Sequence, residues 1–566
     1  MFILAAVLLC GSMSGDVPRL PQLAPGWGAP DRVASVRLHP PSGASPVLKN
    51  IADLLARRIG ERCGARVITE GRVDLDLYLD IEPGIGSEGY AISNSPLGGI
   101  RIAGNDERGL LYGAGKFLRT SEFEGQGFVP SRWRGRSVPD CPARGIYFAV
   151  HFNNYHEAAP TAEVERYVED LALWGMNAVA CNFPPQQFTG LDDPAARRNI
   201  EKIRRLFSAA KRLGLDAGLL EAANCAFTSA PEKIRYSPFN DALNRRSNFG
   251  ILICPSKPEG HEYLLKFWDA VLDEFKDPGL DFFVSWPYDE GGCGCAQCRP
   301  WGARGFLNLS RDIAGLAREK YPGSRFVLST WLYDTPPEGE WEELSRALAA
   351  DGSWVDAVMA DAHEDFPRYP LDHPTPGGKA LLNFPEISMW GQSPWGGYGA
   401  NPLPARFERL WRQASSRLSG GFPYSEGIFE DINKVLCLQF YWSRSRAAMD
   451  IVREYAAAEF SPAVADDVAE AVRVFETNHA RDRVGESAVG ACALMAKAGG
   501  RLPPGIREGW RWRILALRAR IDRELYRNRG KIRGAELARA FAELTAIYHA
   551  QDALDAVRPP HVPASN

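Results

Sequence analysis

The chain has 566 residues, more than one ordinary hydrophobic core can organise, so we expect two to four domains. Its 24% charged and 11% aromatic residues are typical of a globular protein, and the formal net charge is only -4. Binding to nucleic acid requires clustered lysine and arginine, and the sequence has no long basic run, which excludes a nucleic-acid partner from our expectations.

The first ten residues form a short apolar run that predicts export. The run is too short to span a bilayer and small residues follow it, so we expect a signal peptide over residues 1–14. Cys10 hints at a lipoprotein anchor, but Leu9 before it fits that signal poorly, and the usual basic residues are missing. We therefore expect a periplasmic or extracellular protein without an integral membrane segment. The sequence does not indicate the oligomeric state.

Residues 30–135 show the pattern of a small α/β domain. A first helix begins at Ser45, a residue that favours helix N-termini, and keeps an apolar stripe as far as Gly64. The predicted strands cover residues 73–81, 89–93 and 99–103. Asn105 is predicted to cap a second helix, and a linker rich in Trp, Arg and Pro follows over residues 131–142.

From residue 140 to 432, short apolar strands alternate with amphipathic helices, a pattern typical of parallel βα units. The eight predicted strands cover residues 145–151, 178–183, 217–222, 282–287, 326–331, 355–361, 380–385 and 422–426. Eight such units over about three hundred residues predict an α/β fold of the (β/α)8 TIM-barrel type. A doubly wound open sheet is the alternative, but no Gly-x-Gly-x-x-Gly turn follows an early strand. Residues 433–558 predict a helical C-terminal region.

Polar and aromatic residues follow most of these strands. In a TIM barrel the C-terminal strand ends meet at one mouth, where active sites lie. The candidate substrate-binding residues there are His151, Asn153, Asn182, Tyr288, Trp331, Asp361, His363, Trp390 and Tyr424. Amides and carboxylates bind hydroxyl groups, and aromatic faces cover pyranose rings, so this set predicts a sugar site. The alternative for many of them is ordinary helix capping or loop packing, including for Trp390 and Trp395.

Two adjacent acids, Asp289 and Glu290, directly follow the fourth predicted strand. Cleavage of a glycosidic bond needs a protonated acid at the leaving oxygen and a second group that stabilises positive charge at the sugar carbon. We predict Glu290 as the acid, with Asp289 raising its pKa by repulsion or orienting a substrate group. The second carboxylate is Glu386 or Glu426. A position after the seventh strand favours Glu386, whereas the more motif-like sequence of residues 424–427 favours Glu426. A solvated loop with a helix-capping aspartate is the alternative.

Histidine and cysteine patterns give no catalytic metal. The nine histidines include no His-x-x-x-His or His-x-His pair, so we expect neither a metal catalyst nor a cofactor, although His363 lies among acids.

Cys293, Cys295 and Cys298 form a close cluster with three interpretations. They hold a structural zinc with another ligand, form a disulfide plus a free thiol, or brace a loop as reduced thiols. In an exported protein the disulfide is slightly favoured.

Three segments resemble known glycoside hydrolases. Residues 88–118 look like the small domain that precedes the barrel in family 20 hexosaminidases and family 67 α-glucuronidases, and residues 142–145 resemble the start of their first barrel strand. The Asp289-Glu290 pair is similar to the adjacent pair of family 20. The resemblance implies that Arg144 binds sugar hydroxyls, that Asp289 orients a substrate acetamido group acting as nucleophile, and that Glu290 protonates the leaving group.

The sequence also departs from family 20. Residues 285–288 stand where that family has His-x-Gly-Gly, and segments 254–259 and 293–298 look more like the family 163 type, some members of which act on N-glycans. The expected function is therefore an exported glycoside hydrolase acting on an N-acetylhexosamine-containing or related glycan. The alternatives are a catalytically inactive carbohydrate-binding barrel and an α-glucuronidase-like enzyme with a two-carboxylate mechanism.

Overall fold

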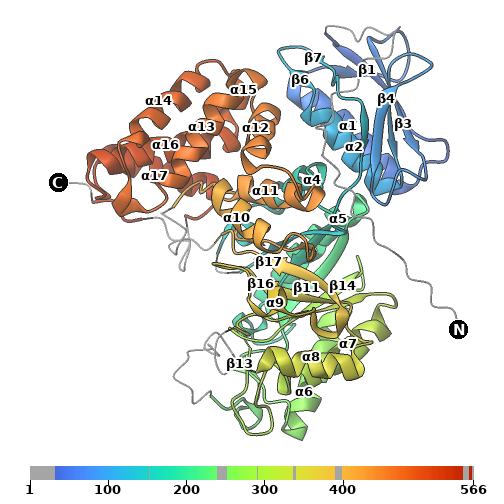
Figure 1. The fold of residues 1–566 in the computed structure, drawn as a ribbon, viewed down its shortest axis with the longest axis vertical. Helices are drawn as coiled ribbons and strands as arrows, with labels where there is room; N and C mark the ends of the chain where they lie inside the picture. The colour runs from blue at the N-terminus through green and yellow to red at the C-terminus, as the bar shows by residue number, and fades with distance from the viewer. Residues whose placement is uncertain are drawn as a thin grey trace, which may run out of the picture.

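The computed structural model describes residues 32–151, 153–238, 251–289, 291–334, 339–388, 398–551 and 560–563. The predicted signal peptide, Glu290, Trp390 and Trp395 lie outside these described residues. Figure 1 shows three groups of elements: a small sheet with two helices near the start of the chain, a barrel, and a cluster of helices near its end. We call them the sheet domain, the barrel and the helical region.

The sheet domain is a six-stranded sheet in the order β2-β1-β3-β5-β4-β8, packed against α1 and α2. Its strands are β1 Ser35–His39, β2 Arg66–Val67, β3 Leu75–Ile81, β4 Tyr90–Asn94, β5 Ile100–Gly104 and β8 Gly135–Ser137. Its helices are α1 Pro46–Cys63 and α2 Glu107–Arg119, and a small hairpin joins β6 Glu122–Phe123 to β7 Phe128–Val129. The predicted linker therefore contributes an edge strand, β8.

The ends of the two helices follow from local side-chain chemistry. Ser45 caps α1 by accepting the N–H of Leu48 at 3.2 Å, and Gly64 ends it with a φ of 65°. The predicted cap of α2 is wrong by one residue, because Asp106 accepts the N–H of Gly109 at 2.9 Å. Asn105 instead accepts backbone N–H groups from the loop after β3, so it shapes the turn and leaves the helix to its neighbour.

The barrel is a closed ring of parallel strands, as the alternating pattern predicts. Its strands are β9 Ala143–Phe148, β10 Ala178–Cys181, β11 Asp216–Ala222, β14 Phe282–Trp286, β15 Arg325–Ser329, β16 Ala357–Asp361, β17 Ala380–Phe384, and β18 Leu418–Gly421 with β19 Tyr424–Ser425. All seven single strands fall within the predicted ranges or within a few residues of them. The eighth is split, since the chain leaves the ladder between β18 and β19, and both pieces pair with β9.

The barrel helices and one small hairpin complete this part of the chain. The helices are α3 Tyr155–Ala158, α4 Thr161–Leu173, α5 Pro194–Arg212, α6 Pro258–Asp273, α7 Gly305–Lys320, α8 Glu340–Asp351, α9 Tyr369–Asp372 and α10 Pro404–Ala414. The hairpin pairs β12 Cys225–Ala226 with β13 Ile251–Leu252. Glycines in the left-handed conformation follow α4 and α5, at Gly175 and Gly214, as the sequence predicts.

The helical region holds α12 Ala448–Glu459, α13 Ala465–Thr477, α14 Ser487–Gly499, α15 Pro504–Glu508, α16 Trp510–Arg527 and α17 Ala535–Tyr548. The predicted boundary at residues 432 and 433 falls inside α11 Asp431–Trp442, a buried helix that contacts β9 and β18 as well as α12. Within the described ranges, no helix combines enough length with enough apolar character to cross a bilayer.

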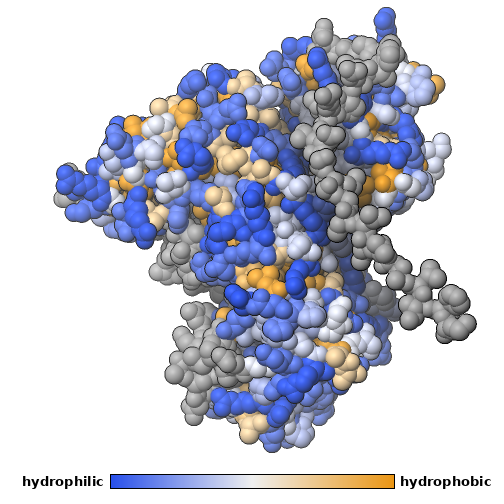
Figure 2. All heavy atoms as spheres, in the orientation of Figure 1, coloured by the Kyte–Doolittle hydropathy of each residue, from blue (hydrophilic) through white to orange (hydrophobic). Residues whose placement is uncertain are grey.

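One face of the molecule, seen in Figure 2, is mostly hydrophilic, and its hydrophobic areas are small and separate. Among the described residues, the exposed large hydrophobic side chains are Val67, Leu97, Val138, Val489 and Tyr526. They are scattered over the sheet domain and the helical region, and do not form a patch of the size expected for a protein interface.

Side chains alternate between the inside and the outside of the barrel. Tyr147 of β9 and Ala149 directly after it face the inner cluster, together with residues of other strands such as Phe282, Val284 and Trp286 of β14. Ile146 and Phe148 face the outer layer between strands and helices. Because successive strand residues point to opposite sides, Arg144 at the start of β9 points outward.

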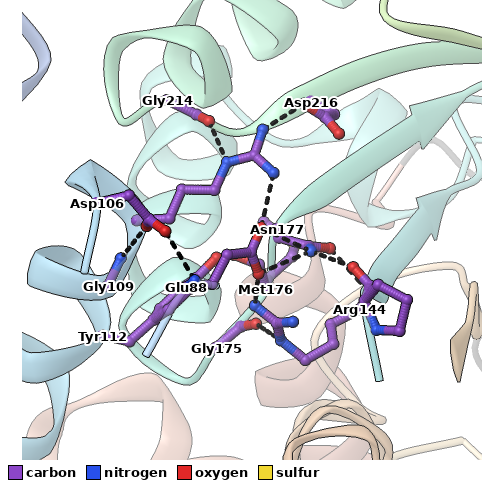
Figure 3. Close-up of polar contacts among 12 residues, drawn as sticks. Glu88, Asp106, Gly109, Tyr112, Arg144, Gly175, Met176, Asn177, Gly214 and Asp216 are labelled. Carbon is purple, nitrogen blue, oxygen red and sulfur yellow. Dashed lines mark hydrogen bonds and ion pairs between the residues drawn. The ribbon is translucent and has the colours of Figure 1, made fainter. Parts of the chain in front are cut away.

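Arg144 joins the base of the barrel to the sheet domain. Its guanidinium is fully buried, forms an ion pair with Glu88, and donates to the carbonyls of Gly175 at 2.8 Å and Cys141 at 2.9 Å (Figure 3). The rings of Tyr112 and Trp442 lie 5.1 and 5.2 Å from it. The predicted role of Arg144 in sugar binding is therefore corrected: it lies at the opposite end of the barrel from the mouth and has no access to a ligand there.

Glu88 accepts three further hydrogen bonds at this junction, from two side chains. Arg108 binds it at 2.9 Å, and the side-chain amide of Asn177 donates to both carboxylate oxygens, at 3.3 and 3.2 Å. Burial raises the pKa of Glu88, but Arg144 and Arg108 outweigh it, so the net pKa is lowered and the group is ionised. Arg108 also reaches Asp216 and the carbonyl of Gly214, which extends the junction to the next barrel unit (Figure 3).

Glu88→Gln should therefore destabilise the protein strongly, because it leaves the buried Arg144 charge without its partner. We expect a loss of about 3–5 kcal/mol. The matched control is Glu82→Gln in the same domain, because the Glu82 side chain is 37% exposed and its pair with Arg101 is worth about 0–1 kcal/mol. Urea unfolding of both variants measures the difference. Equal, small losses would show that the junction does not stabilise the fold.

Candidate active site

Five candidate residues follow consecutive strands and so share one sector of the barrel mouth. Asp289 follows β14, Trp331 follows β15, Asp361 ends β16, Glu386 follows β17 and Glu426 follows β19. Glu386 also forms a parallel bridge with Tyr424. The expected gathering of acids at one rim is therefore present for the described residues, because neighbouring parallel strands end at the same edge.

An aromatic floor closes the barrel beneath these acids. Tyr147, Trp286, Trp331, Phe384 and Tyr424 form its rings. The centroids of Trp286 and Trp331 lie 5.1 Å apart, those of Trp286 and Phe384 lie 4.9 Å apart, and Phe384 reaches Tyr424 at 6.0 Å. Tyr147 lies 5.4 Å from Tyr424. A continuous apolar base with acids around it is the arrangement that binds sugars by their apolar faces and hydroxyl edges.

Glu386 and Glu426 both lie beside Tyr424. Burial raises the pKa of Tyr424 well above its ordinary value, and the charges of Glu426 and Glu386 add to this, so both carboxylates are close to the phenol. The Tyr424 hydroxyl donates to Glu426 at 3.0 Å. Glu386 accepts the N–H of Ser388 at 2.8 Å, which holds its carboxylate in place. The two acids are 4% and 3% exposed, so both carboxylates are buried.

Burial raises the pKa of Glu426 to about 8, and the negative charge of Glu430 contributes to the shift. Glu430 is 1% exposed and is bound by Lys434 at 3.4 Å and by the N–H of Gly427 at 2.6 Å. Glu426 is therefore a protonated carboxylic acid at neutral pH, the state that a proton donor or a neutral hydrogen-bond donor requires.

Asp361, His363 and Trp331 form the other side of the site. Burial raises the pKa of Asp361 to about 7, with a further contribution from Asp334, and the Asp361 carboxylate accepts the N–H of His363 at 2.8 Å. Burial lowers the pKa of His363, whose ring lies 6.3 Å from that of Trp331. The indole Nε1 of Trp331 is buried and has no hydrogen-bond partner among the described residues, so it offers a donor to a bound molecule.

Three further candidates lie at the end of β9 and β10. Burial lowers the pKa of His151 to about 3, so its ring is neutral, and it lies 6.4 Å from Tyr424. The Asn182 side chain accepts the N–H of Val150 at 3.3 Å, which ties β10 to β9 at the rim. Asn153 has a φ of 55° and its N–H donates to Glu157 at 2.6 Å, so the local turn fixes its backbone.

Tyr288 does not line the mouth, and its predicted role in substrate binding is corrected. Its ring is 1% exposed within the outer core and its hydroxyl donates to Glu340. The strand ends at Trp286, so the alternation that would have turned Tyr288 inward stops before it. Trp286 takes that place. Asp289 has a φ of 67°, so the chain turns sharply just where the acid pair begins.

Several residues of the site were not identified from the sequence. Tyr147 and Phe384 have the pattern of ordinary strand residues, and only the inward parity of their strands distinguishes them. Glu430 and Ser388 act through Glu426, since the Ser388 hydroxyl accepts the N–H of Glu426 at 2.8 Å and donates to Glu430. No local motif marks these residues, because their partners come from different strands.

A concave region with a cavity volume of about 420 Å³ lies between the sheet domain and the helical region. Its charged groups pair with each other: Arg58 and Arg511 bind Asp170 at 2.7 and 3.0 Å, and Arg166 binds Glu61 at 2.5 Å. These pairs join α1, α4 and α16. The region therefore functions as a domain junction, and we assign the chemistry to the barrel mouth.

No protein-family model matches the chain, and no curated protein matches it by sequence. Solved structures match it by fold. A family GH115 4-O-methyl-α-glucuronidase with specificity for decorated arabinogalactans aligns with a TM-score of 0.61 and 14% identity, over 92% of this chain and 77% of that one. The family GH89 protein of Clostridium perfringens, solved with GlcNAc-α-1,4-galactose, gives a TM-score of 0.59 and 11% identity, over 88% and 65%.

A family GH20 β-N-acetylhexosaminidase from Streptomyces coelicolor A3(2) aligns with a TM-score of 0.50 and 14% identity, over 81% of this chain and 94% of that one. At such identities the likeness shows the fold alone. The expected resemblance to glycoside hydrolases in which a small α/β domain precedes a TIM barrel is confirmed at that level, and the chain shares its architecture with them.

The raised pKa of Glu426 predicts a pH-dependent effect of Glu426→Gln on stability. Between the ordinary pKa of 4.5 and about 8, folded Glu426 keeps a proton that the unfolded chain has released. Wild-type stability therefore falls as pH rises through this window, whereas glutamine has no proton to lose. The melting temperature of the variant should gain on that of wild type from about pH 4.5 to about pH 8. Glu364→Gln, at an exposed acid, should show no such trend; parallel curves for both variants would contradict the assignment.

Proposed function

We propose that the protein is a glycoside hydrolase and that the barrel mouth is its active site. The observation that carries the proposal is the convergence of Asp361, Glu386 and Glu426 over an aromatic floor, with one of the acids protonated at neutral pH. Hydrolysis of a glycosidic bond needs two such groups in different protonation states. The fold shared with glycoside hydrolases of several families supports the proposal.

We assign the general acid to Glu290, which follows the fourth barrel strand in the sequence, and the second carboxylate to Glu386 after the seventh. Glu290 lies outside the described residues, so this role rests on its sequence position next to Asp289. Glu426 keeps a proton and is therefore better suited to donate a hydrogen bond to the substrate, or a proton, than to act as a nucleophile. If the substrate carries an acetamido group that acts as the nucleophile, Asp289 would orient that group, and this would replace the role given to Glu386.

A neutral sugar suits the described site better than a uronic acid. Asp361, Glu386 and Glu426 are acidic, and burial lowers the pKa of His151 and His363, so neither ring supplies a positive charge. A substrate carboxylate would therefore find no positively charged partner among these residues. An N-acetylhexosamine-containing or related glycan remains our proposed substrate class. Export, based on the apolar N-terminal run, is part of the same proposal.

Glu290→Gln and Glu386→Gln test the assigned roles. Each should lower kcat by roughly 100- to 10,000-fold on the best substrate of an aryl-glycoside and glycan panel, because each removes an acid–base or charge-stabilising group. The matched control is Glu364→Gln, at an exposed acid beside the site, which should retain wild-type turnover. If Glu386→Gln is unaffected and Glu426→Gln is inactive, the second carboxylate is Glu426.

The alternative of a carbohydrate-binding barrel without turnover makes a different prediction for the same panel. Wild-type protein would bind a glycan in calorimetry and release no product.

For Glu386→Ala, formation of a glycosyl azide in the presence of azide would identify a covalent two-carboxylate mechanism. If azide gives no adduct and activity requires a substrate acetamido group, substrate assistance through Asp289 is favoured.

Trp331 offers a test of sugar binding that is separate from the acids. Trp331→Phe keeps an aromatic face but removes the buried Nε1 donor, whereas Trp331→Ala removes both. We expect KM to rise in the order wild type, Phe, Ala, with the alanine variant losing about 1–3 kcal/mol of binding free energy, in the range of a lost stacking contact plus hydrogen bond. Thermal unfolding of both variants provides the control; a loss of stability without a change in KM would make Trp331 a packing residue.

A further inference from the structure

Four cysteine thiols meet beside the loop that begins at Asp289. Cys254 follows the β12–β13 hairpin, and Cys293, Cys295 and Cys298 follow β14. All four sulfur atoms lie within 4.8 Å of one another, and three of the four side chains are buried. The Sγ of Cys254 lies 3.7 Å from that of Cys295 and 3.9 Å from that of Cys298.

These distances fit a shared metal ion and do not fit a disulfide. A disulfide needs sulfur atoms about 2.05 Å apart, and the four cysteines are free thiols. A tetrahedral zinc ion with Zn–S bonds of about 2.3 Å holds its sulfur ligands about 3.8 Å from one another, because the edge of a tetrahedron is about 1.6 times its radius. An iron–sulfur cluster would need the cysteine sulfurs further apart, since iron and sulfide atoms lie between them.

We propose that Cys254, Cys293, Cys295 and Cys298 bind one zinc ion as a structural tetrathiolate site. On binding, the four thiols release four protons to solvent and form four Zn–S bonds, without oxidation or reduction. The fourth ligand, Cys254, is the companion that the sequence pattern of the other three did not reveal. Of the three interpretations of that cluster, the distances support the zinc site. They do not fit the disulfide that the sequence slightly favoured.

The surroundings of the thiols are those of a zinc site. The N–H of Ser237 donates to the Cys293 sulfur at 3.5 Å. The hydroxyl of Ser256 lies 3.0 Å from the Cys254 sulfur and 3.2 Å from the Cys295 sulfur. Donors directed at thiolate sulfurs stabilise their negative charge and orient them toward the metal. Four protein ligands leave no open position, which indicates a structural role.

Asn224 shows what the metal would stabilise. This fully buried side chain donates to the carbonyls of Ile253 at 2.9 Å and Gly292 at 2.8 Å, and accepts the N–H of Gly292 at 3.0 Å. It thus joins the residues directly before Cys254 and Cys293, so the amide and the proposed zinc act on the same two segments. Together they hold the insertion after β11 against the loop after β14. That this positions the acid pair rests on the proposed function; the metal site itself does not.

Metal analysis of the purified full-length protein tests the proposal. Plasma mass spectrometry should find one zinc ion per chain, and X-ray absorption should show four sulfur ligands at about 2.3 Å. Replacement by cobalt should give the visible and charge-transfer bands of a tetrahedral thiolate site. Absence of a bound metal, oxygen or nitrogen ligands in place of sulfur, or an intact mass lower by two hydrogens per disulfide would each overturn the proposal.

Cys295→Ser locates the metal within the chain, with Cys492→Ser as the matched control. Cys295 is the most exposed of the four thiols, whereas Cys492 is a buried thiol in α14, outside the cluster. We expect Cys295→Ser to lose most of its zinc and Cys492→Ser to keep one ion. Equal zinc content in both would overturn the assignment. Should Cys295→Ser fail to fold, the absorption data on the wild-type protein still decide the ligand set.

Glycosidase assays of the same samples separate the two proposals. One zinc ion per chain without turnover on any substrate would support the site and contradict the proposed function. Turnover by a metal-free wild-type protein with four free thiols would do the reverse. If both proposals hold, removal of zinc by a chelator should lower kcat. The wild-type protein and Cys492→Ser should lose the same fraction of their kcat.

Discussion

Closure of a parallel sheet into a barrel is the constraint on which the rest of the structure depends. Once the ring closes, each strand has an inner and an outer side, and the parity of a residue decides whether it meets the aromatic floor or the helices. Glu386 and Tyr424 can meet only because their strands are neighbours in the ring. The same parity places Arg144 outside, where it pairs with Glu88 at the base.

Local patterns predicted the elements well because their causes are local. The period of apolar residues, capping side chains and left-handed glycines gave the eight strands and the helices between them. Relationships between distant segments were not accessible in this way. Arg144 and Cys254 are clear cases: each acquires its role from residues dozens of positions away, Glu88 for the first and Cys293 to Cys298 for the second. Tyr288 was misplaced since the strand stops two residues before it.

The pKa values of the acids at the barrel mouth depend on charged residues behind the mouth as well as on the residues that line it. Glu430 and Lys434 belong to the segment that leads into and through α11, yet the charge of Glu430 helps to keep Glu426 protonated. On the other side, Asp334 acts in the same sense on Asp361. The site thus contains acids whose affinity for protons is set by neighbours that a substrate would never touch, which is how buried sites tune acid–base groups.

The helical region also reaches the site, through the last residue of α17. The hydroxyl of Tyr548 donates to the backbone carbonyl of Glu426 at 2.9 Å, and the N–H of Tyr155 binds the same carbonyl at 3.1 Å. The ring of Tyr548 stacks on Phe429 at 4.3 Å. The final helix therefore supports Glu426, a residue of the barrel mouth, from behind. Shortening the polypeptide from its carboxyl end would withdraw this support from Glu426 at the barrel mouth.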